Sequence, residues 1–99
     1  MVHHIVCWNF NEELSDAEKK EAGTIIKQKL EEIKPYAKGA VSIEVKINEL
    51  ESSNRDVALI SVFETVDDLK AYQVHPMHVK AGEYIRSVTC NRACIDYEE

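Results

Sequence analysis

The chain has 99 residues, of which 44% are hydrophobic and 30% charged, and its formal net charge is −6 at pH 7. This length predicts one domain over residues 1–99, large enough to bury a single core. The acidic balance, without any lysine- or arginine-rich run, argues against a nucleic-acid partner. No apolar run approaches the roughly 20 residues of a membrane span, so we expect no membrane partner.

The cysteine pattern indicates a reducing compartment. Cys7, Cys90 and Cys94 are an odd number with no close pair, and no signal-peptide pattern precedes the first predicted strand. Free thiols that behave as small apolar residues are typical of cytosolic proteins. We therefore expect a cytoplasmic protein without disulfides.

The first third of the chain predicts a strand followed by a long helix. Residues 2–10 are rich in β-branched and aromatic residues, and apolar groups alternate onto both faces, which is typical of a central strand. Ser15 and Glu18 have the spacing of a capping box. The helix they begin should run to Ile33 or Lys34, where Pro35 stops it.

The remaining elements follow from the same periodicities. Residues 40–50 alternate between apolar and polar and predict a half-buried strand towards an edge, whereas 56–63 form the most apolar run and predict a second central strand. Short helices are predicted from Thr65 through Tyr72 and from Pro76 to about Ile85, the second turning Val79 towards the core. Residues 88–97 close the domain as a last strand.

The order strand–helix–strand–strand–helix–strand is that of the α+β, ferredoxin-like split βαβ fold, in which helices cover one face of a four-stranded antiparallel sheet. The other face would then carry apolar side chains that no element of the chain can cover. Because such a patch normally marks an interface, we expect a homodimer in which the two sheets cover each other by two-fold symmetry. The residues of this face are Ile5, Cys7, Ala58, Ile60 and Val62.

The stretch from Tyr72 to His78 brings a phenol and two imidazoles together around Pro76. Proline disfavours a helical conformation at the preceding residue but suits the first position of a helix, so His75 should lie at a helix junction and His78 in the first turn after it. The positive end of that helix should lower the pKa of His78. A neutral imidazole near a tyrosine hydroxyl is suited to acid–base chemistry near pH 7. In the alternative interpretation, Tyr72 only covers the core edge and the histidines make capping or surface hydrogen bonds.

Three segments resemble the stress-responsive dimeric α/β-barrel (Dabb) family: His4–Val6, Ala58–Glu64 and Ala71–Val79, the last with its Tyr-x-x-His-Pro-x-His pattern. The resemblance extends over essentially the full length. It implies a ferredoxin-like monomer whose sheet pairs with that of a second copy to form a dimeric α/β barrel.

The resemblance also implies a set of site residues. The family includes plant olivetolic acid cyclase, which closes a linear polyketide by aldol condensation in a pocket between helices and sheet. By similarity, Tyr72 and His78 match its acid–base pair and His4 matches a further pocket histidine. Val57 stands where the cyclase has a second strand histidine, so the polar lining of the pocket differs. Trp8, on the same strand face as His4, and His75 at the helix junction complete the expected substrate-binding set.

Two functions remain open at this point. In the first, a cofactor-free enzyme uses His78 to take a proton next to a carbonyl while Tyr72 donates a hydrogen bond to the developing oxyanion. In the second, a non-catalytic dimer binds a small-molecule ligand or serves in a stress response. No zinc-ligand spacing is visible, since His3 and His4 point to opposite faces of a strand, so we expect no metal site. Related dimeric barrels also include haem-handling proteins and monooxygenases, but no histidine is marked as an axial ligand.

Overall fold

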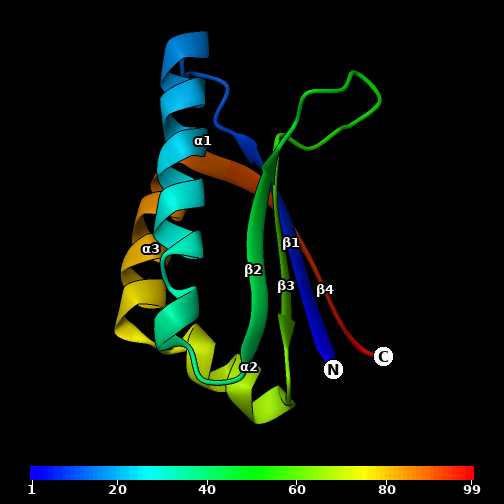
Figure 1. The fold of residues 1–99 in the computed structure, drawn as a ribbon. Helices are drawn as coiled ribbons and strands as arrows, with labels where there is room; N and C mark the ends of the chain where they lie inside the picture. The colour runs from blue at the N-terminus through cyan, green and yellow to red at the C-terminus, as the bar shows by residue number, and fades with distance from the viewer.

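Four antiparallel strands form one sheet in the order β2-β3-β1-β4, and the helices lie together on one of its faces (Figure 1). This is the predicted ferredoxin-like arrangement, here in a computed structural model that describes residues 1–99. The elements are β1 (Val2–Phe10), α1 (Asp16–Glu31), a short 3₁₀ helix η1 (Lys34–Tyr36), β2 (Ala40–Ile47), β3 (Val57–Phe63), α2 (Val66–Gln73), α3 (Pro76–Val88) and β4 (Thr89–Glu98).

The two predicted central strands, β1 and β3, are paired through the middle of the sheet. Val6 lies opposite Leu59 and Val2 opposite Phe63, and all four are almost completely buried against the helices. From α1, Ile26 and Leu30 pack onto this face. Because side chains alternate along a strand, every second residue of β1 points into the core and the residues between them point to the far side of the sheet.

Helix α1 begins as the capping pattern predicts and ends earlier than expected. The Ser15 hydroxyl accepts a hydrogen bond from the backbone N–H of Glu18, whose carboxylate accepts one from the N–H of Ser15. The α-helix ends at Glu31, and Pro35 lies within η1 rather than directly after α1. A 3₁₀ turn tolerates proline in its first positions, so Pro35 is accommodated in the tighter turn that follows α1.

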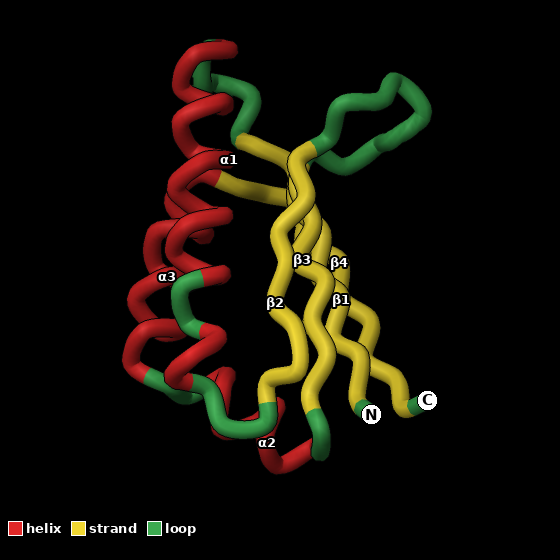
Figure 2. The backbone as a smooth tube through the Cα atoms, in the orientation of Figure 1, coloured by secondary structure: helices red, strands yellow, loops and turns green.

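Two further expectations are corrected. The strand predicted over 40–50 ends at Ile47, and the chain then forms a loop that projects on the side of the sheet away from the helices (Figure 2). Helix α3 continues to Val88, beyond the expected end near Ile85. Val79 is 46% exposed, whereas Ala81 and Ile85 are buried. Ala81 and Ile85 are four residues apart and therefore lie on the same face of α3, which faces the core. Val79 lies on a different face and points outwards.

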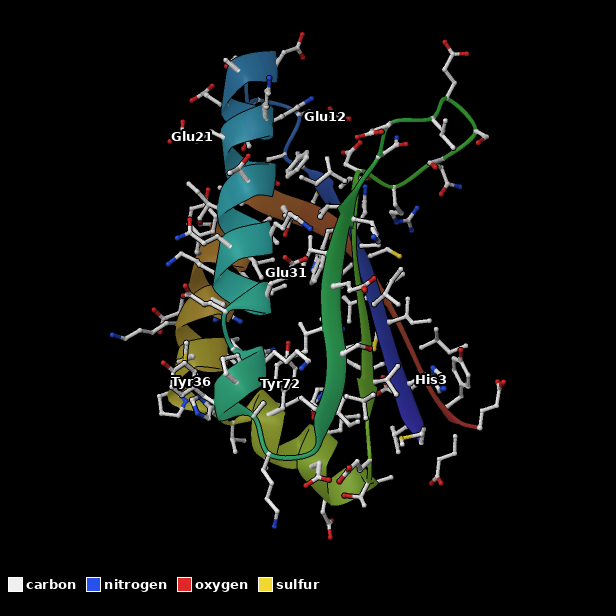
Figure 3. The ribbon with its side chains drawn as sticks, viewed as in Figure 1. His3, Glu12, Glu21, Glu31, Tyr36 and Tyr72 are labelled. Atoms are coloured by element: carbon white, nitrogen blue, oxygen red, sulfur yellow. The ribbon has the colours of Figure 1, made fainter.

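The second face of the sheet is uncovered, as predicted. It carries Ile60 and Ile95, which are 39% and 59% exposed. His3 lies on this face, opposite the helices (Figure 3), and its ring stacks on Tyr97 with centroids 4.7 Å apart. We call this surface the open face, which comprises the outward residues of β1, β3 and β4: His3, Ile5, Cys7, Ala58, Ile60, Val62, Ala93, Ile95 and Tyr97. None of the helices is long and apolar enough to cross a membrane.

Candidate acid–base site

The break between α2 and α3 occurs where the proline predicts it. His75 is the N-cap of α3, and its Nδ1 accepts a hydrogen bond from the backbone N–H of Met77 at 3.1 Å. Pro76 follows in the first turn, where its missing N–H costs no hydrogen bond. The capping bond gives His75 a structural role at the junction, and it places His78 one turn further along the helix.

Tyr72, in the last turn of α2, lies in the space between helices and sheet (Figure 3). Its ring is 4.5 Å from that of His78 and 4.9 Å from that of Phe63, and the residue is only 1% exposed. The hydroxyl is buried and has no hydrogen-bond partner. Burial raises the pKa of Tyr72 well above its usual value of 10.0, because the phenolate would be poorly solvated. The phenol therefore remains a protonated hydrogen-bond donor.

His78 is held in a defined tautomer. Its Nδ1 lies 3.0 Å from the carbonyl oxygen of Gln73. Since a carbonyl can only accept, Nδ1 carries the proton and Nε2 keeps its lone pair in the neutral ring. The pKa of His78 is lowered mainly by burial, with smaller contributions from the charges of His4, Arg86 and Arg92, against the opposing bond to Gln73. The direction is as predicted, but the main cause is burial rather than the helix start. Near pH 7 His78 is an unprotonated base.

His4 reaches the same region from β1. It is 2% exposed, and its ring approaches that of Tyr72 edge-on at 6.4 Å. Its Nδ1 is hydrogen-bonded to the carboxylate of Asp96, the residue opposite it on β4. Asp96 was not found by sequence reasoning, because only the register of β4 against β1 brings the two together. The carboxylate orients the His4 ring and leaves Nε2 on the opposite edge.

The structure also contains one group of side chains that could hold a metal ion. His4, Cys94 and Asp96 place one ligand atom each within 4.8 Å of one another. The Cys94 sulfur lies 3.9 Å from Nδ1 of His4 and 3.7 Å from the Asp96 carboxylate. Spacing within the sequence could not indicate this group, since its members come from the first and last strands. In the structure Nδ1 of His4 is already bonded to Asp96. Burial and the neighbouring Asp96 raise the pKa of Cys94, so the thiol is not an activated nucleophile.

A cavity of about 170 Å³ lies between α3 and the sheet, beside these residues. Its apolar wall comes from β1, β3, α1 and α3, and its polar groups come from both sides. It is lined by His4, Val6, Trp8, Leu30, Leu59, Gln73, His78, Gly82, Ile85, Arg86 and Arg92. A larger hollow, of about 540 Å³, lies under the 48–56 loop and contains no histidine or tyrosine. The smaller cavity is therefore the one that adjoins the acid–base groups.

Of the expected site residues, His4, Trp8 and His78 line this cavity together. Tyr72 is not on the cavity wall but directly behind His78, with which its ring is in contact. Val57 is buried on the same sheet face, opposite Trp8, and does not reach the cavity. His75 does not line it either, because its ring caps α3.

Two arginines complete the wall, and neither was found by sequence reasoning. Arg86 comes from the last turn of α3. Arg92 comes from β4, just after an irregularity where the pairing shifts between Cys7 and Asn9. There Asn91 adopts a positive φ of 53°. The extra residue is a β-bulge, and it sets which side chains of the following strand face the helices.

The comparison with protein families decides the identity of the domain. The model for the stress responsive A/B barrel domain (Dabb) matches residues 2–99. The chain belongs to this family. None of the curated proteins with which it was compared matches it.

Solved structures share the ferredoxin-like fold of this chain. A dimeric ferredoxin-like protein of unknown function from Bacteroides fragilis is 33% identical with a TM-score of 0.92, over 99% of this chain and 95% of that one. A dimeric ferredoxin-like protein from Thermobifida fusca is 20% identical with a TM-score of 0.77, over 97% of this chain and 88% of that one. A Dabb family protein from Mesorhizobium loti is 15% identical with a TM-score of 0.75, over 99% and 95%. The latter two likenesses concern the fold.

Within this A/B barrel domain, the site combines three chemical capacities. His78 supplies an unprotonated nitrogen, Tyr72 supplies a protonated hydroxyl without a partner, and the cavity supplies a small space beside them with both apolar and polar walls. These are the elements of proton transfer to and from carbon, for which the acid and the base must be close and oppositely protonated.

Proposed function

We propose that this A/B barrel protein is a homodimer whose subunits each bind a small carbonyl compound and catalyse proton transfer at the carbon next to the carbonyl, without a cofactor. The observation that carries this proposal is the contact between Tyr72, with its partnerless buried hydroxyl, and His78, with its free Nε2. A buried donor without a protein partner is costly and uncommon, so the unpaired hydroxyl supports a role in ligand binding.

In the proposed step, Nε2 of His78 takes a proton from the α-carbon, the electron pair of the broken C–H bond forms a carbon–carbon double bond, and the π pair of the carbonyl moves onto its oxygen. For the Tyr72 hydroxyl to donate a hydrogen bond to that developing oxyanion, the His78 ring has to move aside, because Tyr72 lies behind it and not on the cavity wall. Return of the proton from His78 to the same or another carbon regenerates the base. General acid–base assistance of this kind contributes about 10²–10⁴-fold.

The proposed dimer uses the open face. Contact between two such faces would remove the exposed Ile60 and Ile95 from water. The cavity lies on the other side of the sheet, between α3 and the strands. The two surfaces are therefore separate, and pairing of the sheets leaves the cavity on the outside of each subunit.

A second candidate is a non-catalytic dimer that only binds a small ligand. The position of Tyr72 behind His78, rather than on the cavity wall, favours it. In that case the Tyr72 ring would serve the packing of Phe63 and His78, and its hydroxyl would take no part in chemistry.

Exchange of carbon-bound protons tests the proposal without knowledge of the natural substrate. Methyl levulinate, a small neutral ketone, is incubated with the protein in D₂O near pH 7, and loss of its α-proton signals is followed by NMR against a buffer blank. We expect exchange above the blank, and reduction by at least tenfold in His78→Gln and in Tyr72→Phe.

Tyr84→Phe is the matched control, because Tyr84 lies on α3 outside the cavity lining. It should exchange like the unaltered protein. Exchange at the blank rate for both methyl levulinate and its free acid, levulinate, or exchange that survives His78→Gln, contradicts the catalytic proposal. Loss in His78→Gln but not in Tyr72→Phe would leave His78 as the base and remove Tyr72 from the mechanism.

A further inference from the structure

Charge is distributed unevenly around the cavity. The chain carries 18 acidic against 12 basic residues and has only three arginines, of which two, Arg86 and Arg92, line this one small space. They reach it from different elements, α3 and β4. The third, Arg55, is bonded to the backbone carbonyls of Asn91 and Asn54.

Neither cavity arginine has a carboxylate partner. The ion pairs of the structure join Lys27 to Glu31 and Lys46 to Glu44, and the carboxylate of Asp96 is hydrogen-bonded to the His4 ring. Arg86 could serve only to complement the negative end of α3, where a basic residue is favourable. That explanation does not apply to Arg92, which lies in a strand and is turned to the same cavity by the bulge at Asn91.

From this arrangement we infer that the ligand is a small carbonyl compound bearing an anionic group, a carboxylate or a phosphate, that binds between Arg86 and Arg92 with its carbonyl towards His78. The orientation rests on the proposed function, whereas the anion site itself does not. Guanidinium groups suit both anions, because their N–H groups form paired hydrogen bonds to two oxygens. The volume of about 170 Å³ is below that of pockets for drug-sized ligands, so the ligand is small.

Anion binding would also act on the base. The charges of Arg86 and Arg92 contribute to the lowered pKa of His78. An anion between the guanidinium groups offsets those charges, so His78 becomes a stronger base when the ligand is in place. Recognition of the anion and activation of the proton transfer would then be coupled through charge.

Trp8, the only tryptophan of the chain, lines the cavity and provides a fluorescence readout. Levulinate, its neutral methyl ester and 3-oxobutylphosphonate are titrated into the full chain near pH 7, with saturation-transfer NMR as a second measure of binding. We expect the two anions to bind at least tenfold more tightly than the ester. Arg86→Gln and Arg92→Gln should each weaken anion binding by about tenfold or more, since hydrogen bonds to charged groups are among the stronger ones.

Lys80→Gln is the matched control, because it removes an exposed positive charge from the same helix at a residue that does not line the cavity. It should leave all three affinities within about twofold. The inference is overturned if levulinate and its methyl ester bind equally well, or if Lys80→Gln weakens anion binding as much as the arginine variants do. It is also overturned if neither method detects binding of either anion. The preferred anion distinguishes a carboxylate ligand from a phosphate.

The two proposals fail in different ways. If methyl levulinate exchanges its protons through His78 while levulinate gains nothing from the arginines, the catalytic function stands and the anion site is wrong. If levulinate binds through both arginines but neither ketone exchanges, the anion site stands and the protein is a binding module.

Discussion

At the scale of single residues, the state of His78 depends on groups that oppose each other. The hydrogen bond to Gln73 favours the protonated ring, whereas burial and the nearby positive charges of Arg86 and Arg92 disfavour it, and the latter prevail. The same burial keeps the neighbouring phenol of Tyr72 protonated. A single apolar environment thus drives a base and an acid into the neutral forms that proton transfer requires.

The lowered pKa of His78 predicts how stability depends on pH. His78 takes up its proton at about pH 6.5 in the unfolded chain and only at lower pH in the folded chain. Acidification below pH 6.5 therefore favours unfolding, whereas above that pH the contribution of His78 to the free energy of unfolding is constant. Urea unfolding from pH 5 to 8, at fixed protein concentration, should show the unaltered protein losing stability relative to His78→Gln as the pH falls. A difference that is constant with pH, or that grows in favour of the unaltered protein, contradicts the shift.

His75 should contribute to stability through its cap. Because its Nδ1 accepts the N–H of Met77, His75→Ala leaves that donor unpaired and should lower the free energy of unfolding by about 1 kcal/mol. Asparagine is a preferred N-cap residue, so His75→Asn should restore most of the loss. Denaturant unfolding of the two variants measures this directly, and equal stability of alanine and asparagine would show that the cap contributes nothing.

At the scale of elements, periodicity predicted the strands, the helices and their order, because buried faces repeat every two residues in strands and every three to four in helices. The helix break was predicted from Pro76, because proline restricts the backbone of its own residue and of the residue before it in any fold. The phase of α3 was misjudged by one position at Val79, because Val79 and His78 are neighbours and only packing decides which faces the sheet.

The arginines and Asp96 could not be found in this way. A charged residue on an element that is mostly exposed gives no periodic signal, and its neighbours depend on tertiary pairing. For Arg92 and Asp96 that pairing includes a bulge at Asn91, which shifts the register of β4 against β1. Nothing within the β4 sequence alone indicates where this extra residue lies.

The bulge can be tested at its strained position. Asn91 has a φ of 53°, in the left-handed region that asparagine and glycine tolerate and β-branched residues do not. Asn91→Val should lower the free energy of unfolding by about 1–2 kcal/mol, whereas Asn91→Gly should be close to neutral. Thermal or urea unfolding compares them. If valine is tolerated as well as glycine, the strand does not hold this bulge in solution.

At the scale of the whole molecule, the sheet separates two surfaces of different character. Its helix-facing side forms the core and one wall of the cavity, and its open face presents Ile5, Ile60 and Ile95 to solvent in a single chain. Apolar residues in one contiguous patch indicate an interface more strongly than scattered ones do. The ferredoxin-like proteins from Bacteroides fragilis and Thermobifida fusca are themselves dimeric.

A charge placed in the middle of the open face should prevent the proposed pairing of sheets. In Ile60→Asp, pairing of the open faces would bury one carboxylate of each subunit without a partner, so we expect a monomer or aggregate where the unaltered protein is a dimer. Light scattering coupled to size-exclusion chromatography measures the mass, and circular dichroism confirms that the fold persists. Val66→Asp is the control, because Val66 is 40% exposed at the start of α2, away from this face. A stable dimer of Ile60→Asp would place the interface on another surface of the molecule.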